Sequence, residues 1–485
     1  MKLSQIIKNL DIIACTADTD SEITGICYDS RAAKPGDMFV AIRGFESDGH
    51  KYIPSAVSKG ASVILCEIPP EDGTPYVQVA DCRYALAVAS RDFFGDPASE
   101  MTMIGLTGTN GKTTSSYLIK HMLEAKLDAK VGLVGTNGNM IGDEFIPSDR
   151  TTPESYELQR LFREMADAGC THVVMEVSSH SLILSRVVGI HFDVALFTNL
   201  TQDHLDFHGT MEEYARAKSL LFAQSSVGWI NADDRWAQFM LDRAKCPTHI
   251  YSADLSSAEL FARDIRLSAT GVRFAAVHGD ELALVKLNIP GMFSVHNALG
   301  VIAAGLSLGI SLSDCADALA SAKGVKGRVE VVPTDGDYAI LIDYAHTPDA
   351  LENVLKTLKP VTRGRLIAVF GCGGDRDKQK RPIMGAIAAE TADICVVTSD
   401  NPRTEDPDTI ISEILPGMQA YKHTKVKAIT DRVKAIHWAI DTALPGDVVL
   451  LAGKGHEDYQ EINHEKRHMD EREIVADYLK ERAKR

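Results

Sequence analysis

A glycine-rich segment stands between a predicted strand and a predicted helix, and its residue types suit phosphate chemistry. Gly108-Thr109-Asn110-Gly111-Lys112-Thr113 follows the apolar run 101–107 and opens an amphipathic pattern over 112–126. In that context backbone N–H groups and the helix N-terminus converge on phosphate oxygens. Lys112 would contact the β and γ phosphates as a point charge, and the Thr113 hydroxyl would ligate Mg²⁺. The segment therefore predicts binding of magnesium ATP.

The loop departs from the usual Walker spacing, because Leu106 stands where that pattern has a glycine. It is a shortened relative of the form GxxGKT. A turn that merely connects a strand to a helix is the competing interpretation, but a lysine and two threonines at a helix start have no packing reason to be there. Nucleotide binding is the better interpretation. A phosphate loop alone does not separate kinases, GTPases, motors and ligases.

A second polar group follows the next two predicted strands. Glu176 lies near the end of the apolar run 171–177, and the run 192–198 leads into a segment that contains His204. Open α/β sheets bind ligands at the carboxyl ends of their strands. An acid and an imidazole beside a phosphate loop can hold a divalent ion against phosphate oxygens. Taken alone, however, His204 is more typical of a surface histidine than of a metal ligand.

The segment 214–222 predicts a helix that buries Tyr214, Leu221 and Phe222. Lys218 lies in the same segment. On this pattern alone we expect Lys218 to be a solvated surface lysine, because lysine is almost never fully buried without a partner.

Short β-rich apolar runs alternate with amphipathic helices along the chain, which predicts α/β domains with mainly parallel sheets. At 485 residues the chain is too long for one hydrophobic core. We expect three domains, 1–98, 99–328 and 329–485. Glycine and proline in 94–97 mark the first boundary, and the second is placed near 327–328.

Individual elements follow from the same signals. Thr152, Pro153 and Glu154 predict a helix start with Thr152 as the N-cap, and the apolar spacing continues to a stop near Gly169. Another helix is predicted to begin around Ser294. Apolar runs in the last third predict strands at 338–343, 365–370, 393–398 and 448–452.

Composition argues against several classes of function. The formal net charge of -16 makes nonspecific binding to nucleic acid or anionic lipid unfavourable. No run approaches the ~18 continuous apolar residues of a membrane span, and Asn9 and Asp11 interrupt the apolar residues that a signal peptide would need. Nine cysteines without a CxxC pair are typical of a reducing compartment. We therefore expect a cytoplasmic protein with no membrane or nucleic-acid partner.

Three blocks taken together resemble one known family. TGTNGKTT at 107–114, EVSSHSL at 176–182 and TNLTQDHLDFHGTMEEYARAKSLLF at 198–222 are similar to the motifs of the Mur ligase family of bacterial cell-wall synthesis. Further segments extend the resemblance over essentially the whole chain: DSRAAKPGDMFVA from 29, DRTTPE from 149, DYAHTPDAL from 343, GCGGDRDKQKRPIMG from 371, SDNPRTEDP from 399 and AGKGHEDYQ from 452.

The resemblance implies an ATP-dependent amide ligase with three domains. The small α/β N-terminal domain would bind the UDP-sugar, the central P-loop ATPase-type domain would bind ATP, and the C-terminal Rossmann-like domain would bind an incoming amino acid. The blocks are most similar to those of members that add meso-diaminopimelate to UDP-N-acetylmuramoyl-L-Ala-D-Glu through an acyl phosphate. We expect these substrates, ATP and Mg²⁺ as partners of a monomeric chain.

Three alternatives stay open at this point. A homologue that adds L-lysine would share most of the motifs. A folylpolyglutamate synthase-like ligase would share the ATP domain but would not need the segment around Ser30 or the DNPR motif. An inactive ATP-binding scaffold is disfavoured because the four residues expected to act in catalysis are all present: Lys112, Glu176, His204 and Lys218.

The resemblance also assigns residues to each ligand, one group at a time. The metal would be held by Thr113, Glu176, His204 and Lys218, the last as a carbamate formed with carbon dioxide. ATP would be bound by Gly108, Thr109, Asn110, Gly111, Lys112, Thr113, Thr114, Asn297, Arg328 and Asp343. The UDP-sugar and its peptide would contact Ser30, Thr151, Thr152, Ser178 and Arg186. Diaminopimelate would contact Arg376, Asp400, Asn401, Arg403, Gly453 and Glu457.

Two stretches qualify these assignments. Phe45-Glu46-Ser47 occupies a stretch that varies in the family, so backbone contacts there are not assigned. The glycine-rich 371–374 resembles a second dinucleotide loop, but Asp375 and Asp377 would repel a pyrophosphate. Arg376 between them suits a carboxylate, which favours an amino-acid pocket.

Overall fold

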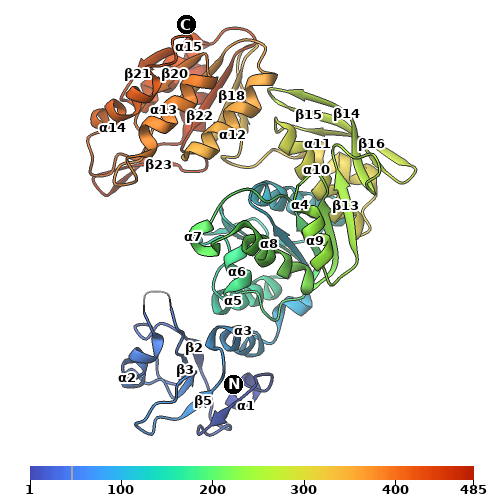
Figure 1. Ribbon diagram of the computed structural model, residues 1–485, viewed down its shortest axis with the longest axis vertical. Coiled ribbons are helices and arrows are strands. Elements are labelled where there is room, and N and C mark those ends of the chain that lie inside the picture. Colours follow the sequence, from blue (N-terminus) through green and yellow to red (C-terminus); the bar gives the residue numbers. More distant parts are fainter. Residues whose placement is uncertain (45–46, 485) are drawn as a thin grey trace. The chain divides into compact units, whose positions relative to one another are not determined.

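Helices and strands alternate along most of the chain, which confirms the predicted α/β class (Figure 1). The protein is described by a computed structural model that covers residues 1–44 and 47–484. The variable stretch Phe45-Glu46-Ser47 therefore lies largely outside the described residues.

The chain divides into two compact units. The first contains residues 1–251 and 303–310, and the second contains 252–302 and 311–485. The domain boundaries expected at residues 98 and 328 stay predictions.

The first unit begins with a five-stranded sheet in the order β1-β5-β4-β3-β2, in which only β1 is antiparallel to its neighbour. Its strands are β1 (Ala14–Cys15), β2 (Gly25–Cys27), β3 (Asp37–Val40), β4 (Val63–Cys66) and β5 (Tyr76–Gln78). Its helices are α1 (Leu3–Ile6), α2 (Ile53–Ser58) and α3 (Cys82–Phe93). Successive residues of β3 and β4 enter two different apolar clusters, so the sheet is buried on both faces.

The three strands predicted around the phosphate loop are confirmed as β6 (Thr102–Thr107), β10 (His172–Glu176) and β11 (Phe192–Phe197). They are adjacent in the parallel series β13-β12-β11-β6-β10-β7. The other strands of this region are β7 (Val131–Gly135), β8 (Gly138–Ile141), β9 (Glu144–Ile146), β12 (Ser225–Asn231) and β13 (Thr248–Ser252). Parallel neighbours end at one edge, so β6, β10 and β11 deliver their following loops to the same place.

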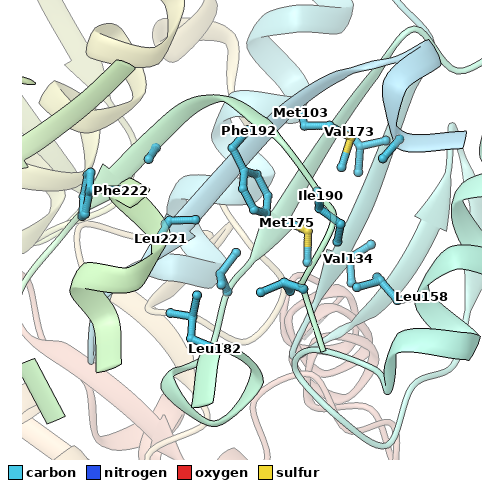
Figure 2. Close-up of a cluster of buried hydrophobic side chains, with 14 of the residues drawn as sticks. Met103, Val134, Leu158, Val173, Met175, Leu182, Ile190, Phe192, Leu221 and Phe222 are labelled. Carbon is cyan, nitrogen blue, oxygen red and sulfur yellow. The ribbon is translucent and has the colours of Figure 1, made fainter. Parts of the chain in front are cut away.

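Apolar side chains from these strands and from the segments that cover them form one core (Figure 2). Met103, Met175 and Phe192 from the three central strands are fully buried. Leu221 and Phe222 pack into the same core from the turn that follows α8 (Met211–Ser219), as the sequence predicted. Their burial anchors the last turn of α8, which carries Lys218.

One helix follows the predicted bounds and another does not. α4 spans Lys112–Leu127 and confirms the helix after the phosphate loop. α5 spans Ser155–Asp167 with Glu154 as its N-cap, so the prediction of Thr152 as N-cap was wrong. The Thr152 hydroxyl donates instead to the Glu176 carbonyl oxygen at 2.8 Å. This contact with a distant strand takes the side chain away from the helix that its local sequence favours.

The second unit opens with an antiparallel meander that the sequence analysis missed. Its strands are β14 (Leu260–Ser268), β15 (Gly271–His278) and β16 (Glu281–Leu287). Exposed and buried residues alternate along most of β16, and that period of two was the available signal. The helix predicted to begin around Ser294 is confirmed as α10 (Met292–Ser307), and α11 (Leu312–Ser321) follows it.

The last third of the chain forms a six-stranded sheet in the order β17-β18-β22-β19-β20-β21, with only β17 antiparallel. The four predicted strands are confirmed within it. The strands are β17 (Glu330–Val332), β18 (Ala339–Asp343), β19 (Leu366–Phe370), β20 (Ile394–Val397), β21 (Lys425–Ala428) and β22 (Val448–Ala452). The helices are α12 (Pro348–Leu358), α13 (Lys380–Thr391), α14 (Pro407–Ile414), α15 (Arg432–Thr442) and α16 (Glu471–Arg482), and a hairpin of β23 (Tyr459–Ile462) and β24 (Glu465–His468) follows β22.

Two further findings concern membrane-spanning helices and the cysteines. Among the described residues, no helix is both long enough and apolar enough to cross a bilayer. All nine cysteines lie within the described part of the chain, and none of them forms a disulfide there.

Candidate active site

The phosphate loop connects β6 to α4, in the strand-to-helix context that the sequence predicted. Gly108 and Gly111 adopt φ angles of 149° and 87°, which side chains rarely tolerate. A Cβ at Gly108 would stand 1.9 Å from Thr198 Oγ1, at the end of the neighbouring strand. The helix begins at Lys112, so its first backbone N–H groups border the loop. This arrangement suits an anion that carries several phosphates.

Two lysines donate to a single carbonyl of this loop. Lys112 Nζ lies 2.9 Å from the Gly108 carbonyl oxygen, and Lys218 Nζ lies 2.8 Å from the same oxygen. Lys218 is only 1% exposed, so the surface position expected from the helical pattern alone was wrong. Burial, and then the Lys112 cation, lower the pKa of Lys218 well below its usual range. The site therefore favours the neutral amine of Lys218.

Glu176 is fully buried at the end of β10 and accepts three hydrogen bonds. They come from Thr113 Oγ1 at 3.0 Å and from the backbone N–H and hydroxyl of Thr136, each at 3.0 Å. A Cβ at Gly135 would lie 2.4 Å from Glu176 Oε1, so glycine leaves room for the carboxylate. Thr113 and Glu176 thus present the oxygen ligands that Mg²⁺ prefers.

Thr136 was not among the predicted site residues. It directly follows β7, the strand beside β10, so it reaches the same sheet edge as Glu176. Its position after an apolar run, followed by asparagine and glycine, was the signal that the sequence offered.

His204 lies on the surface, as its pattern alone suggested. Its side chain is 49% exposed and its Nε2 lies 3.4 Å from Asp203 Oδ2. Its ring meets the ring of His180 edge-on, with centroids 4.9 Å apart. Across the described chain, no three His, Cys, Asp or Glu side chains come close enough to hold a metal ion by themselves. An ion bound here would need other donors, such as a threonine hydroxyl, phosphate oxygens or a modified lysine.

Four of the residues expected to contact the UDP-sugar and its peptide lie together beside Glu176. Thr152 Oγ1 lies 3.4 Å from Ser178 Oγ, and Arg186 Nη1 donates to the Thr152 carbonyl oxygen at 3.1 Å. Thr151 Oγ1 lies 3.0 Å from the Thr136 hydroxyl, which itself donates to Glu176. Burial lowers the pKa of Arg186 below its usual value.

Ser30, the fifth residue of that group, lines a separate pocket of about 650 Å³ with Arg31, Arg83 and Glu154. Glu154 also pairs with Arg186, at 2.7 Å between Oε1 and Nη2. From the sequence, Glu154 was expected only to be an acidic residue near the start of a helix. Its ion pair links this pocket to the cluster around Thr152.

Asn297, Arg328 and Asp343, the remaining residues expected to bind ATP, belong to the second unit. Asp343 ends β18 and accepts the backbone N–H groups of Val329 at 2.8 Å and Ala345 at 2.9 Å. Burial nevertheless raises the pKa of Asp343. Asn297 is buried on α10. The phosphate loop belongs to the first unit, so a joint role of these three residues with that loop stays a prediction.

Asp400, Asn401, Gly453 and Glu457 come together at the carboxyl edge of the C-terminal sheet. Asn401 Nδ2 donates to Glu457 Oε2 at 2.9 Å. A Cβ at Gly453 would lie 2.5 Å from Asp400 Oδ2. That oxygen is buried and takes no hydrogen bond from the described residues. An unpaired buried acceptor is costly, so a donor that came within reach of this oxygen would be stabilised.

The two predicted arginines of this site flank one glycine. A Cβ at Gly373 would lie 3.0 Å from Arg403 Nη1 and 3.9 Å from Arg376 Cγ. Arg403 Nε donates to Glu461 Oε2 at 3.0 Å, and its Nη1 donates to the Gly374 carbonyl oxygen at 2.8 Å. Arg376 is exposed. The structure thus brings both arginine side chains to the glycine-rich loop that follows β19.

Buried Arg381 fixes that same loop from within the domain. It is fully buried and donates to Glu405 Oε1 at 2.9 Å, to Glu405 Oε2 at 3.0 Å and to the Gly373 carbonyl oxygen at 3.3 Å. The hydrogen bonds from Arg381 lower the pKa of Glu405 from 4.5 to about 2. The ionised pair therefore stabilises the fold above the unfolded pKa, and this stability is lost as the pH falls through the folded value.

We expect Glu405→Gln to lower the free energy of unfolding by about 1–3 kcal/mol at pH 7, because Arg381 loses one of its two ionised partners, Glu405 and Glu413. The difference from wild type should shrink as the pH falls from 4.5 toward 2. Urea unfolding at pH 7, 5 and 3 measures it. Glu465→Gln, at an exposed pair with Arg467, is the matched control. A difference that does not vary with pH would contradict the assignment.

Comparison with known proteins finds family models that match most of the chain. Three family models match successive parts of the chain: "Mur ligase family, catalytic domain" over 22–96, "Mur ligase middle domain" over 106–305, and "Mur ligase, glutamate ligase domain" over 327–455.

Individual relatives match over nearly the full length. The UDP-N-acetylmuramoyl-L-alanyl-D-glutamate--2,6-diaminopimelate ligase of Clostridium botulinum is 46% identical over 488 residues, which cover 99% of this chain and 100% of that protein. The ligase of the same name from Caldanaerobacter subterraneus is 47% identical over 466 residues, 96% of each chain. A solved structure of a ligase of this name is 33% identical with a TM-score of 0.78, and the match covers 100% of this chain and 99% of that one. The three family models and the relatives that are 46% and 47% identical over nearly the whole chain show that it belongs to the Mur ligase family.

Proposed function

We propose that this chain is an ATP-dependent ligase that adds meso-2,6-diaminopimelate to UDP-N-acetylmuramoyl-L-alanyl-D-glutamate in peptidoglycan precursor synthesis. The main support for this proposal is sequence identity of 46% and 47% with two ligases of that name over nearly the whole chain. It favours this function over a folylpolyglutamate synthase-like ligase. We also propose that the chain acts as a monomer in the cytoplasm, where its nine thiols would stay reduced.

The proposed chemistry follows from the low reactivity of a carboxylate toward an amine. Attack on a carboxylate would have to expel an oxide ion, which is a poor leaving group. The glutamate carboxylate of the UDP-sugar peptide attacks the γ-phosphorus of ATP, which forms an acyl phosphate and releases ADP. The amine of diaminopimelate attacks the acyl carbon, loses a proton and expels phosphate, which leaves an amide. Lys112 and the loop N–H groups offset the charge on the phosphates.

The proposed metal site combines Thr113, Glu176, His204 and a carbamate on Lys218. A neutral Lys218 amine would attack carbon dioxide, form a C–N bond and lose a proton. The product is an anionic oxygen ligand where the unmodified chain has an amine. Burial and the lowered pKa of Lys218 support this, because only the neutral amine reacts. A bound Mg²⁺ would supply charge neutralisation for phosphoryl transfer.

The proposed amino-acid site offers cations to a carboxylate of diaminopimelate and acceptor oxygens to an amine. Arg403 and Arg376 would bind a carboxylate, because a guanidinium fork matches carboxylate geometry. The unpaired Asp400 Oδ2 and the carboxylate of Glu457 would accept hydrogen bonds from an amine. The UDP-sugar and its peptide would contact Ser30, Thr151, Thr152, Ser178 and Arg186.

An ADP-release assay tests this function directly. The protein is mixed with ATP, Mg²⁺, UDP-N-acetylmuramoyl-L-Ala-D-Glu and a panel of amino acids that includes L-lysine. We expect sustained ADP release only when the UDP-sugar dipeptide and meso-diaminopimelate are both present. ADP release without an amino-acid requirement would instead indicate an ATPase, and none under any condition would indicate a scaffold.

Lys112→Ala is expected to lower the rate of acyl-phosphate formation by roughly 100-fold or more, because the charge of the phosphates is no longer offset. Binding of the UDP-sugar dipeptide should persist, since Ser30 and the residues near Thr152 are unchanged. Rapid-quench detection of the acyl phosphate and calorimetric binding of the dipeptide measure the two effects. Parallel loss of dipeptide binding and turnover would count against separate sites.

A further inference from the structure

Lys454 is a buried cation beside the proposed amino-acid site that no assignment so far has used. It lies in the turn after β22 and its side chain is fully buried. Its Nζ donates to Asn401 Oδ1 at 2.7 Å and to Glu457 Oε2 at 2.8 Å. Asn401 Nδ2 closes the triangle by donating to the same Glu457 oxygen at 2.9 Å. A buried ammonium needs such partners, because desolvation of an unpaired charge is costly.

The triangle fixes which way the Asn401 amide points. Asn401 Oδ1 accepts from Lys454 Nζ and also from the backbone N–H of Glu461 at 2.9 Å. A flipped amide would turn its NH₂ group against an ammonium and a second N–H donor. The NH₂ group is therefore held toward Glu457, with one of its two hydrogens used there.

The same contacts fix the Glu457 carboxylate. Both hydrogen bonds that it receives from described residues end on Oε2. Its Oε1 takes none from them, so that oxygen keeps its acceptor capacity for a ligand. Asp400 Oδ2, next to Gly453, is a second acceptor without a partner. Two oxygens at this site are thus left for donors.

We propose that Lys454 is a positioning residue for the amino-acid substrate. It holds Asn401 and Glu457 in one arrangement before the amino acid arrives, so binding does not have to order them. This inference rests on the proposed function, because it takes Asn401 and Glu457 as contacts of diaminopimelate. It adds a residue that does not itself touch the substrate.

The chain supplies a matched control. Lys454 and Lys466 both place Nζ near the Tyr459 ring, at 5.2 Å and 4.2 Å from its centroid. Lys466 is exposed on β24 and has no part in the triangle. Lys454→Met and Lys466→Met therefore make the same chemical change at two lysines that lie near one aromatic ring.

The test measures KM for each of the three substrates and the melting temperature. For Lys454→Met we expect the KM for diaminopimelate to rise about 10- to 100-fold, while the KM values for ATP and the UDP-sugar dipeptide change by less than about 3-fold. Lys466→Met should match wild type. Equal KM values for diaminopimelate in Lys454→Met and wild type would overturn the proposal. So would a rise shared by all three substrates, which would indicate a general structural role.

A double-variant cycle adds a readout that does not depend on stability alone. If Lys454 acts through Glu457, then Lys454→Met should raise the KM for diaminopimelate far less in a Glu457→Gln background than in wild type. Fully additive effects would overturn the proposal. Should Lys454→Met fail to fold, Lys454→Gln, which keeps one hydrogen-bond donor, is measured in the same cycle. If wild-type protein shows no turnover with diaminopimelate, the proposed function fails; if wild type is active and only the Lys454 effects are missing, this inference alone fails.

Discussion

Lys218→Ala is expected to reduce ligation by roughly 1,000-fold, and bicarbonate or a short carboxylic acid such as acetate should restore part of the activity. Under the carbamate proposal, the group that the alanine variant lacks is an anionic oxygen ligand. Lys218 lies buried against the phosphate loop, where its carbamate would face the phosphates. Initial rates with increasing acetate measure the rescue. Full activity of the alanine variant would contradict the carbamate proposal.

Two comparisons sharpen this test. Arg216→Ala changes an exposed cation on the same helix, with a side chain that is 54% exposed, and should keep wild-type activity. Carbon-13 NMR of wild-type protein in labelled bicarbonate should show a carbamate signal that Lys218→Ala lacks. A variant that is equally inactive with and without carboxylic acids, while the wild type gives no carbamate signal, would indicate that Lys218 acts as an amine.

Arg403→Ala is expected to cost about 2–5 kcal/mol of transition-state stabilisation with meso-diaminopimelate, as for truncation of one partner in a buried charged pair. This corresponds to a loss of roughly 30- to 5,000-fold in kcat/KM. Glu461 and the Gly374 carbonyl oxygen hold the guanidinium of Arg403 in place, so the fork is oriented before a ligand binds. Wild type should strongly prefer meso-diaminopimelate over L-lysine, whose bare distal ammonium the arginine repels.

Steady-state kinetics with both amino acids check this prediction. Arg467→Ala, on the hairpin strand β24 with a side chain that is 63% exposed, is the control and should behave as wild type. Equal kcat/KM for the two amino acids in the wild type would refute the specificity, even if the ligase function stood. A similar fractional loss for both amino acids in Arg403→Ala would show that the arginine supports the loop without reading the distal carboxylate.

Elements built from short-range patterns were predictable from the sequence. The strand, glycine-rich loop and helix around Lys112 form one contiguous stretch, and the apolar runs before Glu176 and Thr198 read as buried strands. Because parallel strands end at a common edge, the predicted parallel sheet already implied that these loops would lie at the same edge. The antiparallel strands β14 to β16 were missed although the alternation along β16 was present in the sequence.

Burial and hydrogen-bond partners were decided only by the tertiary structure. Lys218 has the spacing of a surface lysine, yet it is buried and donates to the carbonyl oxygen of Gly108, 110 residues away. Burial of Leu221 and Phe222 in the core holds its helix in this position. Thr152 has the local signals of a helix cap, yet its hydroxyl bonds the Glu176 carbonyl. The physical reason is the same in both cases. A polar side chain takes the partner that burial brings to it, and that partner lies in a segment whose distance along the chain no local pattern encodes.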